Sequence, residues 1–382
     1  MNGAEPTEIV KEKSSKLSAG DWVEVRSKDE ILRTLDGDGR LDGMPFMPEM
    51  FAFCNKRFQV YKRAHKTCDT VFPVRGRRVS EAVHLDTRCD GSAHGGCQAS
   101  CLIFWKDAWL KPLGKNPAPA KSHPGGIGQH AGSSNGNASN SASVSTSGCT
   151  EATVLARTQT ADSNPSDPTY SCQATLLPYA TTQLDWWDIR QYIEDYSSGN
   201  VGLWRIICGF TYFSFMGLTQ VIGGPTLRRL YDKFHRLWGG TPYPRKTGKI
   251  PEGEATPAET LNLQPGELVR IKSHDEILAT LNTRSRNRGL YWDAEEVPYC
   301  GGTYQVLKRV SKIINERTGK MREMQTPCLI LDSVICESRY SECRLFCPRS
   351  IYSYWREIWL ERVTPAGSEA RPSEEIESVA QH

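Results

Sequence analysis

The chain contains one characteristic stretch of sequence twice, in two similar copies. The first copy begins Gly20-Asp21-Trp22-Val23-Glu24-Val25-Arg26-Ser27-Lys28-Asp29-Glu30-Ile31-Leu32. The second begins Gly266-Glu267-Leu268-Val269-Arg270-Ile271-Lys272-Ser273-His274-Asp275-Glu276-Ile277-Leu278, at an offset of 246 residues. Both copies close on a tryptophan-rich segment, residues 104–110 and 354–360. The sequence therefore predicts a tandem repeat over residues 20–113 and 264–364.

The pattern inside each copy predicts short strands with one helical turn. Apolar and polar residues alternate from Asp21 to Arg26, which is typical of a half-buried strand. Ser27 followed by Glu30, and Ser273 followed by Glu276, are capping boxes that start a short helix. Several such strands in about 90 residues favour a small antiparallel barrel or sheet. We expect an α+β chain, in which two mostly antiparallel, barrel-like β modules each carry a Cys-rich knuckle.

The opening residues of each copy also resemble a known kind of strand. Gly20-Asp21-Trp22-Val23 and Gly266-Glu267-Leu268-Val269 share the order glycine, acid, apolar residue, valine. This order is similar to the first strand of Src-homology-3-like barrels, including the type found in nitrile hydratase β subunits. The resemblance implies a small barrel for each repeat. The metal-binding motif of that enzyme is absent from the sequence, so its activity is not implied.

The segments outside the repeats differ in composition. Residues 125–148 are almost wholly Gly, Ser, Asn and Ala, so residues 114–184 are predicted to be a flexible linker. Residues 239–263, rich in Gly, Pro and Thr, are predicted to be a second linker. Residues 1–19 and 365–382 are predicted to be disordered tails.

Residues 185–238 are predicted to form a helical segment, with helices over 186–197, 201–222 and 226–238. The second of these is the most apolar run in the chain and is long enough to cross a bilayer. Its polar residues and three glycines favour burial between the repeats instead. Peripheral membrane contact, aided by the basic helix 226–238, is the first alternative, and a true span is the second.

The bulk properties restrict the function classes. The chain has 382 residues, a net charge of +3 and 13 cysteines. A charge of this size does not by itself indicate nucleic-acid binding. The first residues lack the basic start and apolar run of a signal peptide. We therefore expect a reducing, cytoplasmic compartment, with association to the inner face of a membrane as an option, and there clustered cysteines more often bind metal than form disulfides.

A cluster of four cysteines in each repeat is the strongest chemical signal. Four thiolates from separate chain segments suit a tetrahedral metal site. We expect two zinc sites, one per repeat, and an iron–sulfur cluster is the alternative. Buried thiols and disulfides remain further interpretations. The predicted metal ligands are Cys54, Cys89, Cys97 and Cys101 in the first repeat and Cys300, Cys336, Cys343 and Cys347 in the second.

Other reactive residues carry weaker signals. Cys68 and Cys328 occur in one repeat each, and packing is the favoured interpretation of both. His94 lies near the cluster as a candidate ligand or partner, although an exposed loop position is favoured. A Cys/His catalyst in both repeats is excluded, because the second repeat has His274 alone. The pairs Trp105/Trp109 and Trp355/Trp359 are interpreted as core, and Asp107 and Glu357 as solvated.

These features favour a non-catalytic function. The leading hypothesis is a zinc-stabilised scaffold that binds another protein, with contact to a membrane surface as an option. The second is a redox or iron–sulfur accessory protein of a biosynthetic enzyme system. The third is nucleic-acid binding, since basic residues cluster in both repeats, but a solvated hairpin is the commoner explanation.

Overall fold

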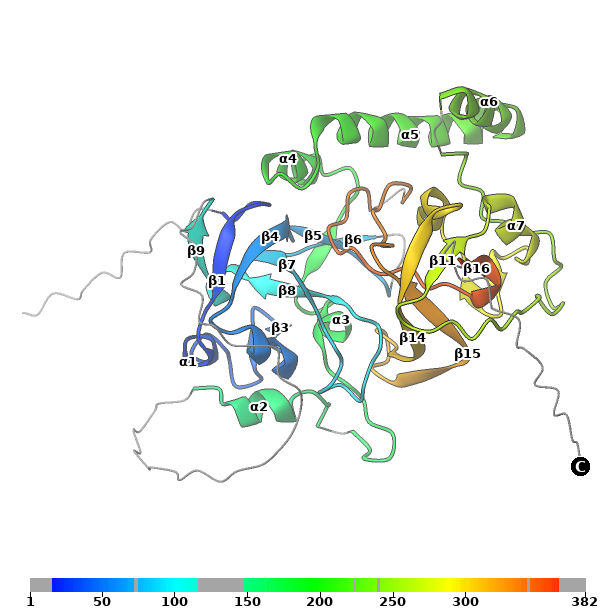
Figure 1. Ribbon diagram of the computed structural model, residues 1–382. Coiled ribbons are helices and arrows are strands. Elements are labelled where there is room, and N and C mark those ends of the chain that lie inside the picture. The colour runs from blue at the N-terminus through cyan, green and yellow to red at the C-terminus, as the bar shows by residue number, and fades with distance from the viewer. Residues whose placement is uncertain are drawn as a thin grey trace, which may run out of the picture. The chain divides into compact units, whose positions relative to one another are not determined.

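The computed structural model describes residues 16–71, 75–115, 148–161, 163–222, 224–238, 241–341 and 344–363 (Figure 1). Contacts divide the chain into two compact units. The N-terminal unit comprises Met1–Pro225, Lys312–Glu323 and Glu337–Ile351, and the C-terminal unit comprises Thr226–Ser311, Met324–Cys336 and Tyr352–His382. Each contains helices and antiparallel sheet, so the chain is a mixed α and β protein, as predicted.

A five-stranded antiparallel sheet forms the centre of the N-terminal unit. Its strand order is β8 (Leu102–Lys106), β7 (Ala82–Arg88), β4 (Arg57–Arg63), β1 (Trp22–Val25) and β9 (Leu110–Gly114). In β1, Val23 and Val25 are buried, whereas Trp22 and Glu24 are half-buried. The alternation predicted for the first strand is therefore present, and it places one face of β1 in the core.

Smaller elements surround this sheet. A three-stranded sheet has the order β10 (Thr182–Leu184), β6 (Gly76–Arg78) and β5 (Lys66–Cys68). The hairpin of β2 (Arg40–Leu41) and β3 (Met44–Pro45) lies between helix α1 (Lys28–Leu32) and a 3₁₀ helix over Pro48–Phe53. The 3₁₀ helix matters for the site below, because it presents Glu49 and Met50 to the interior.

Residues 148–184 differ from the prediction of a flexible linker. They contain α2 (Glu151–Ala156) and α3 (Gln173–Leu176), and Val154 and Leu177 belong to the core of the N-terminal unit. The Gln173 side chain donates to the carbonyls of Pro45 and Phe104 and accepts from the Phe104 amide. These apolar and amide contacts order the segment, and the Gly/Ser-rich residues 116–147 lie outside the described chain.

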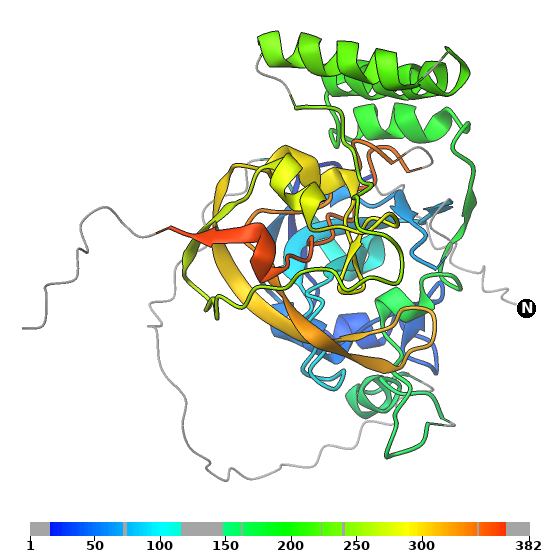
Figure 2. The ribbon, with the colours of Figure 1, turned by 90° about the vertical axis from the view of Figure 1, so that its right-hand side faces the viewer.

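The C-terminal unit contains a four-stranded antiparallel sheet. Its order is β15 (Met321–Leu331), β14 (Thr303–Ile314), β11 (Leu268–Ile271) and β16 (Leu360–Arg362). Figure 2 shows β14 and β15 as a long, curved pair in yellow and orange, and their tip, Lys312–Glu323, belongs to the N-terminal unit. Helix α7 (His274–Ala279) and the hairpin of β12 (Arg286–Asn287) and β13 (Leu290–Tyr291) complete the unit. Residues 241–263, predicted as a linker, contain no helix or strand, but Leu263 is buried in the core.

The same local contacts occur in both units. Each predicted capping box is present, with Ser27 bonded to Glu30 and Ser273 to Glu276. The four paired tryptophans are fully buried, which confirms their interpretation as core. The matching backbone bonds are Gly20 N to Val60 O and Gly266 N to Val306 O, both 2.8 Å, and Arg26 N to Trp109 O and Lys272 N to Trp359 O, both 2.9 Å.

The acids that follow β8 and precede β16 are not solvated, contrary to the prediction. Asp107 accepts from Arg63 at 2.6 Å, and Glu357 accepts from Arg309 at 2.6 Å. Both acids lie at the start of a 3₁₀ turn and receive a cation from the neighbouring long strand. Their side chains are largely buried, so each pair is an internal contact of its own unit.

The predicted helical segment is present as α4 (Arg190–Ser197), α5 (Leu203–Ile222) and α6 (Gly224–Trp238). Among the described residues, no helix has both the length and the apolar character needed to cross a membrane. In the N-terminal unit, α5 packs through Phe213 on Trp186 and through Arg205 on Glu337. It is not buried along its full length, because Trp204 is 75% exposed and Val221 is 84% exposed.

Candidate metal centre

Three of the predicted cysteines lie in the connection between β7 and β8. This connection, residues 89–101, is held at its ends by a 2.9 Å bond from the Cys89 amide to the Cys101 carbonyl. Within it, Gly91 has a φ of +73°, and a Cβ there would lie 2.1 Å from the carbonyl oxygen of Cys97. Only glycine fits at this position. The tight turn therefore brings Cys97 back towards the end of β7.

Glu49, Cys89 and His94 form the one group of three or more His, Cys, Asp or Glu residues in the described chain whose ligand atoms all lie within 4.8 Å of one another. His94 Nδ1 is 2.7 Å from Glu49 Oε1, and Nε2 is 3.1 Å from the carbonyl of Ser171. The Cys89 thiol donates to Glu49 Oε1 at 3.8 Å. Glu49 Oε2 is buried without a hydrogen-bond partner. The prediction that His94 is an exposed loop residue is wrong, because His94 is buried.

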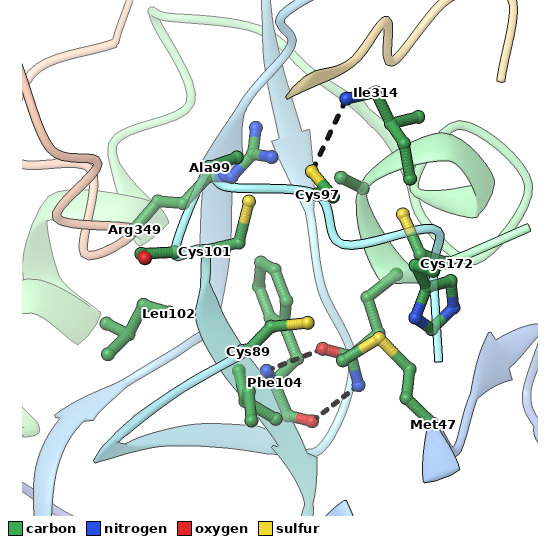
Figure 3. Close-up of a pocket in the computed structure, with 15 residues that line it drawn as sticks. Met47, Cys89, Cys97, Ala99, Cys101, Leu102, Phe104, Cys172, Ile314 and Arg349 are labelled. Atoms are coloured by element: carbon green, nitrogen blue, oxygen red, sulfur yellow. Dashed lines mark hydrogen bonds between the residues drawn. The ribbon is translucent and has the colours of Figure 1, made fainter. Parts of the chain in front are cut away.

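A small cavity of about 40 Å³ adjoins this group and is lined by four cysteines (Figure 3). We call it the thiol cavity. Cys89, Cys97 and Cys101 come from the connection between β7 and β8, and Cys172 is the N-cap residue of α3. No three of these sulfurs lie within 4.8 Å of one another. The cavity thus brings together three of the four ligands predicted for the first repeat, with Cys172 in place of Cys54.

Three thiols of this cavity, those of Cys89, Cys101 and Cys172, have pKa values raised by burial and are protonated at neutral pH when no metal is bound. Burial raises the pKa of Cys101 to about 12. Burial, followed by the charge of Glu49, raises the pKa of Cys89, and burial raises that of Cys172. Reactive cysteines need a lowered pKa, because the thiolate is the nucleophile. These three residues are therefore not activated nucleophiles, and a bound cation is what would deprotonate them.

The tip of the β14–β15 hairpin supplies polar groups to the thiol cavity. The Ile314 amide donates to Cys97 Sγ at 3.3 Å, as Figure 3 shows. Arg349, which is buried, also lines the cavity and donates to Glu316 Oε1 at 2.9 Å. The same guanidinium lies 3.9 Å from the sulfur of Cys68. An amide donor to Cys97 and a buried guanidinium paired with Glu316 therefore line the cavity.

The other predicted ligands lie elsewhere. Cys54 packs against the core of the N-terminal unit, where Lys28 is a charged neighbour, and it does not line the thiol cavity. Cys347 belongs to the N-terminal unit and accepts from the Cys68 amide at 3.1 Å. Cys343 lies outside the described residues. Cys300 and Cys336 belong to the C-terminal unit, so the four-cysteine site of the second repeat stays a prediction.

Sequence reasoning missed Cys172 and Glu49. Cys172 follows the Gly/Ser-rich segment, and no pattern around it predicts that it folds against β8. Glu49 could have been noticed in the sequence, because the offset of 246 residues places another glutamate, Glu295, at the matching position. Both glutamates are buried in the structure. An acid that recurs at matching positions of two similar segments is a candidate for a buried carboxylate.

Comparison with protein-family models and with curated proteins finds no match to the chain. The function is therefore inferred from the residues themselves.

Proposed function

We propose that this chain is an iron–sulfur accessory protein whose cluster is held by Cys89, Cys97, Cys101 and Cys172. The spacing of the four sulfurs around one cavity supports this proposal. Tetrahedral zinc with Zn–S bonds of about 2.3 Å holds its sulfurs about 3.8 Å apart. No three sulfurs of the thiol cavity come within 4.8 Å. A cluster of several iron atoms spreads its four cysteines more widely than a single ion does.

The surroundings of the sulfurs also favour a cluster. Hydrogen bonds to cysteine sulfur stabilise reduced, negatively charged clusters and tune their potential. The Ile314 amide supplies such a bond to Cys97, and the buried guanidinium of Arg349, paired with Glu316, lines the same cavity. The cavity, at about 40 Å³, is far smaller than an organic substrate requires. The proposed role is therefore structural or electron-carrying, without a substrate at the cluster.

A zinc-stabilised scaffold that binds a protein partner is the second candidate function. It is favoured by the short distances among Glu49, Cys89 and His94 and by the unpartnered Glu49 Oε2. Zinc accepts carboxylate, thiolate and imidazole ligands. If zinc were bound by His94 Nδ1, the 2.7 Å hydrogen bond between Nδ1 and Glu49 Oε1 would have to break. Because both centres use Cys89, they exclude each other.

We propose in addition that the two units contain copies of one small, barrel-like module. The support is the shared capping boxes, the matched backbone bonds and the internal ion pairs of Asp107 and Glu357. In this proposal the connection 89–101 is the Cys-rich knuckle of the first module.

Metal and sulfide analysis of protein purified without oxygen or chelators tests these proposals. The cluster predicts equal amounts of iron and acid-labile sulfide and a brown colour. Colourless protein with one zinc per chain would favour the scaffold, provided that Glu49→Gln and His94→Asn each lower the zinc content. Protein with neither metal above trace amounts would contradict both candidates.

A further inference from the structure

Helix α6 presents its apolar stripe to solvent. Leu230 is 62% exposed, Phe234 is 56% exposed and Leu237 is 78% exposed. Residues spaced by four and by three positions lie on one face of a helix. An amphipathic helix of a globular protein normally turns such a stripe towards the core.

The opposite face of α6 packs against its own unit through polar and aromatic groups. Asp232 binds the Arg245 guanidinium and accepts from the Tyr243 amide at 2.7 Å. The ring of Tyr231 lies 5.9 Å from that of Tyr243, and Arg228 lies over Tyr243 at 4.9 Å. The helix is thus attached by its polar side, so the outward position of the apolar stripe is a consequence of specific contacts.

Basic residues border the exposed stripe on one side. Arg229, Lys233 and Arg236 are exposed and recur with the same spacing as the apolar residues, about a quarter of a turn away around the helix. The helix has a single acidic residue, Asp232, which is on the attached side and paired with Arg245. The exposed half of α6 therefore combines three apolar side chains with three positive charges.

We propose that α6 is a docking surface for an anionic lipid bilayer. Apolar side chains flanked by basic residues are the pattern of a helix that lies in the plane of the headgroups. Leu230, Phe234 and Leu237 would enter the acyl boundary, and the adjacent cations would contact anionic headgroups. With 15 residues the helix does not cross the bilayer. This surface is independent of the metal centre.

Co-sedimentation of the full chain with vesicles tests this proposal. Vesicles of phosphatidylcholine with phosphatidylserine should bind the protein, and vesicles of phosphatidylcholine alone should not. Arg229→Gln, Lys233→Gln and Arg236→Gln together should weaken binding about a hundredfold at low salt. Leu230→Ser, Phe234→Ser and Leu237→Ser together should abolish it.

Matched controls carry the same changes at other exposed positions. Arg284→Gln, Arg317→Gln and Arg322→Gln control for charge, and Leu155→Ser, Ile189→Ser and Ile193→Ser control for apolar surface. Single variants Lys233→Gln and Leu237→Ser repeat the test with less change to the fold. No binding at low salt, equal binding to neutral vesicles, or equal effects of the control and α6 variants would overturn the proposal. The proposal would also be overturned if the protein self-associated without lipid and the Leu230, Phe234 and Leu237 variants abolished that association. The exposed stripe of α6 would then bind a second copy of the chain instead of a bilayer.

Discussion

The amide of Ile314 donates a hydrogen bond of 3.3 Å to the sulfur of Cys97, although 217 residues separate them. Ile314 ends β14, so its amide reaches the thiol cavity from the tip of the hairpin. The thiol cavity of the N-terminal unit is therefore completed by a segment far away in the sequence, the tip of the β14–β15 hairpin, which belongs to the same unit.

Removal of this donor should lower the reduction potential of the proposed cluster. Ile314→Pro removes the amide hydrogen, whereas Ile314→Ala keeps it and removes most of the side chain. Hydrogen bonds to cluster sulfur raise the potential, because they stabilise the more negative reduced state. Potentiometric titration should give a lower value for Ile314→Pro than for Ile314→Ala. Equal potentials in the two variants would show that the bond has no influence.

Gln173→Ala should destabilise the N-terminal unit by about 3 kcal/mol, since buried backbone groups that lose their partners cost about 1–3 kcal/mol each. The side chain bonds the amide and carbonyl of Phe104 and the carbonyl of Pro45. Gln183→Ala, at an exposed position of β10, is the control and should change stability by less than about 0.5 kcal/mol. Urea unfolding measures both. If both variants changed the free energy of unfolding by a similarly small amount, residues 148–184 would not be an integral part of the N-terminal unit.

Asp107→Asn should lower the free energy of unfolding of the N-terminal unit by about 3 kcal/mol, because it leaves the buried Arg63 guanidinium without its counter-charge. Glu357→Gln should likewise destabilise the C-terminal unit, where Glu357 also accepts from the amides of Leu261 and Leu263. Asp38→Asn breaks an exposed pair with Arg157 and should cost less than about 1 kcal/mol. Thermal unfolding of the three variants checks this ranking, and a loss at Asp38 equal to that at Asp107 would contradict it.

His84 should make the N-terminal unit less stable in acid. Burial lowers the pKa of His84 from 6.5 to about 3. As the pH falls, the unfolded chain binds the proton first, so stability decreases from about pH 6.5 down to about pH 3. The offset of 246 residues places the buried Ile330 at the matching position of the second repeat. His84→Ile should therefore have a smaller loss of stability between these pH values, measured by urea unfolding. An unchanged pH dependence would assign the acid sensitivity to other groups.

The sequence pattern was sufficient where short-range chemistry decides structure. Ser27 with Glu30 predicted a capped helix, and apolar spacing predicted the helices near residues 190, 203 and 224, within four residues at their starts. The buried tryptophans also followed from their repeated spacing.

Long-range contacts were not predictable in the same way. Cys172 reaches the thiol cavity because Gln173 binds β8, and Ile314 reaches it because the hairpin is long. Neither contact has a local sequence pattern. The sequence suggested four ligands in each repeat. Two of these cysteines, Cys54 and Cys300, match at the offset, and both pack against the core of their units.

In the proposed function, Cys89, Cys97, Cys101 and Cys172 hold one cluster. Cys172→Ser and Cys54→Ser change the same atom, and both cysteines are partly buried in the N-terminal unit. The most direct measurement is the iron and sulfide content of these two variants beside the unmodified chain, all purified without oxygen. We predict that Cys172→Ser loses most of the iron and sulfide and that Cys54→Ser retains both. Loss of iron and sulfide in Cys54→Ser, with retention of both in Cys172→Ser, would show that these four cysteines do not hold the cluster.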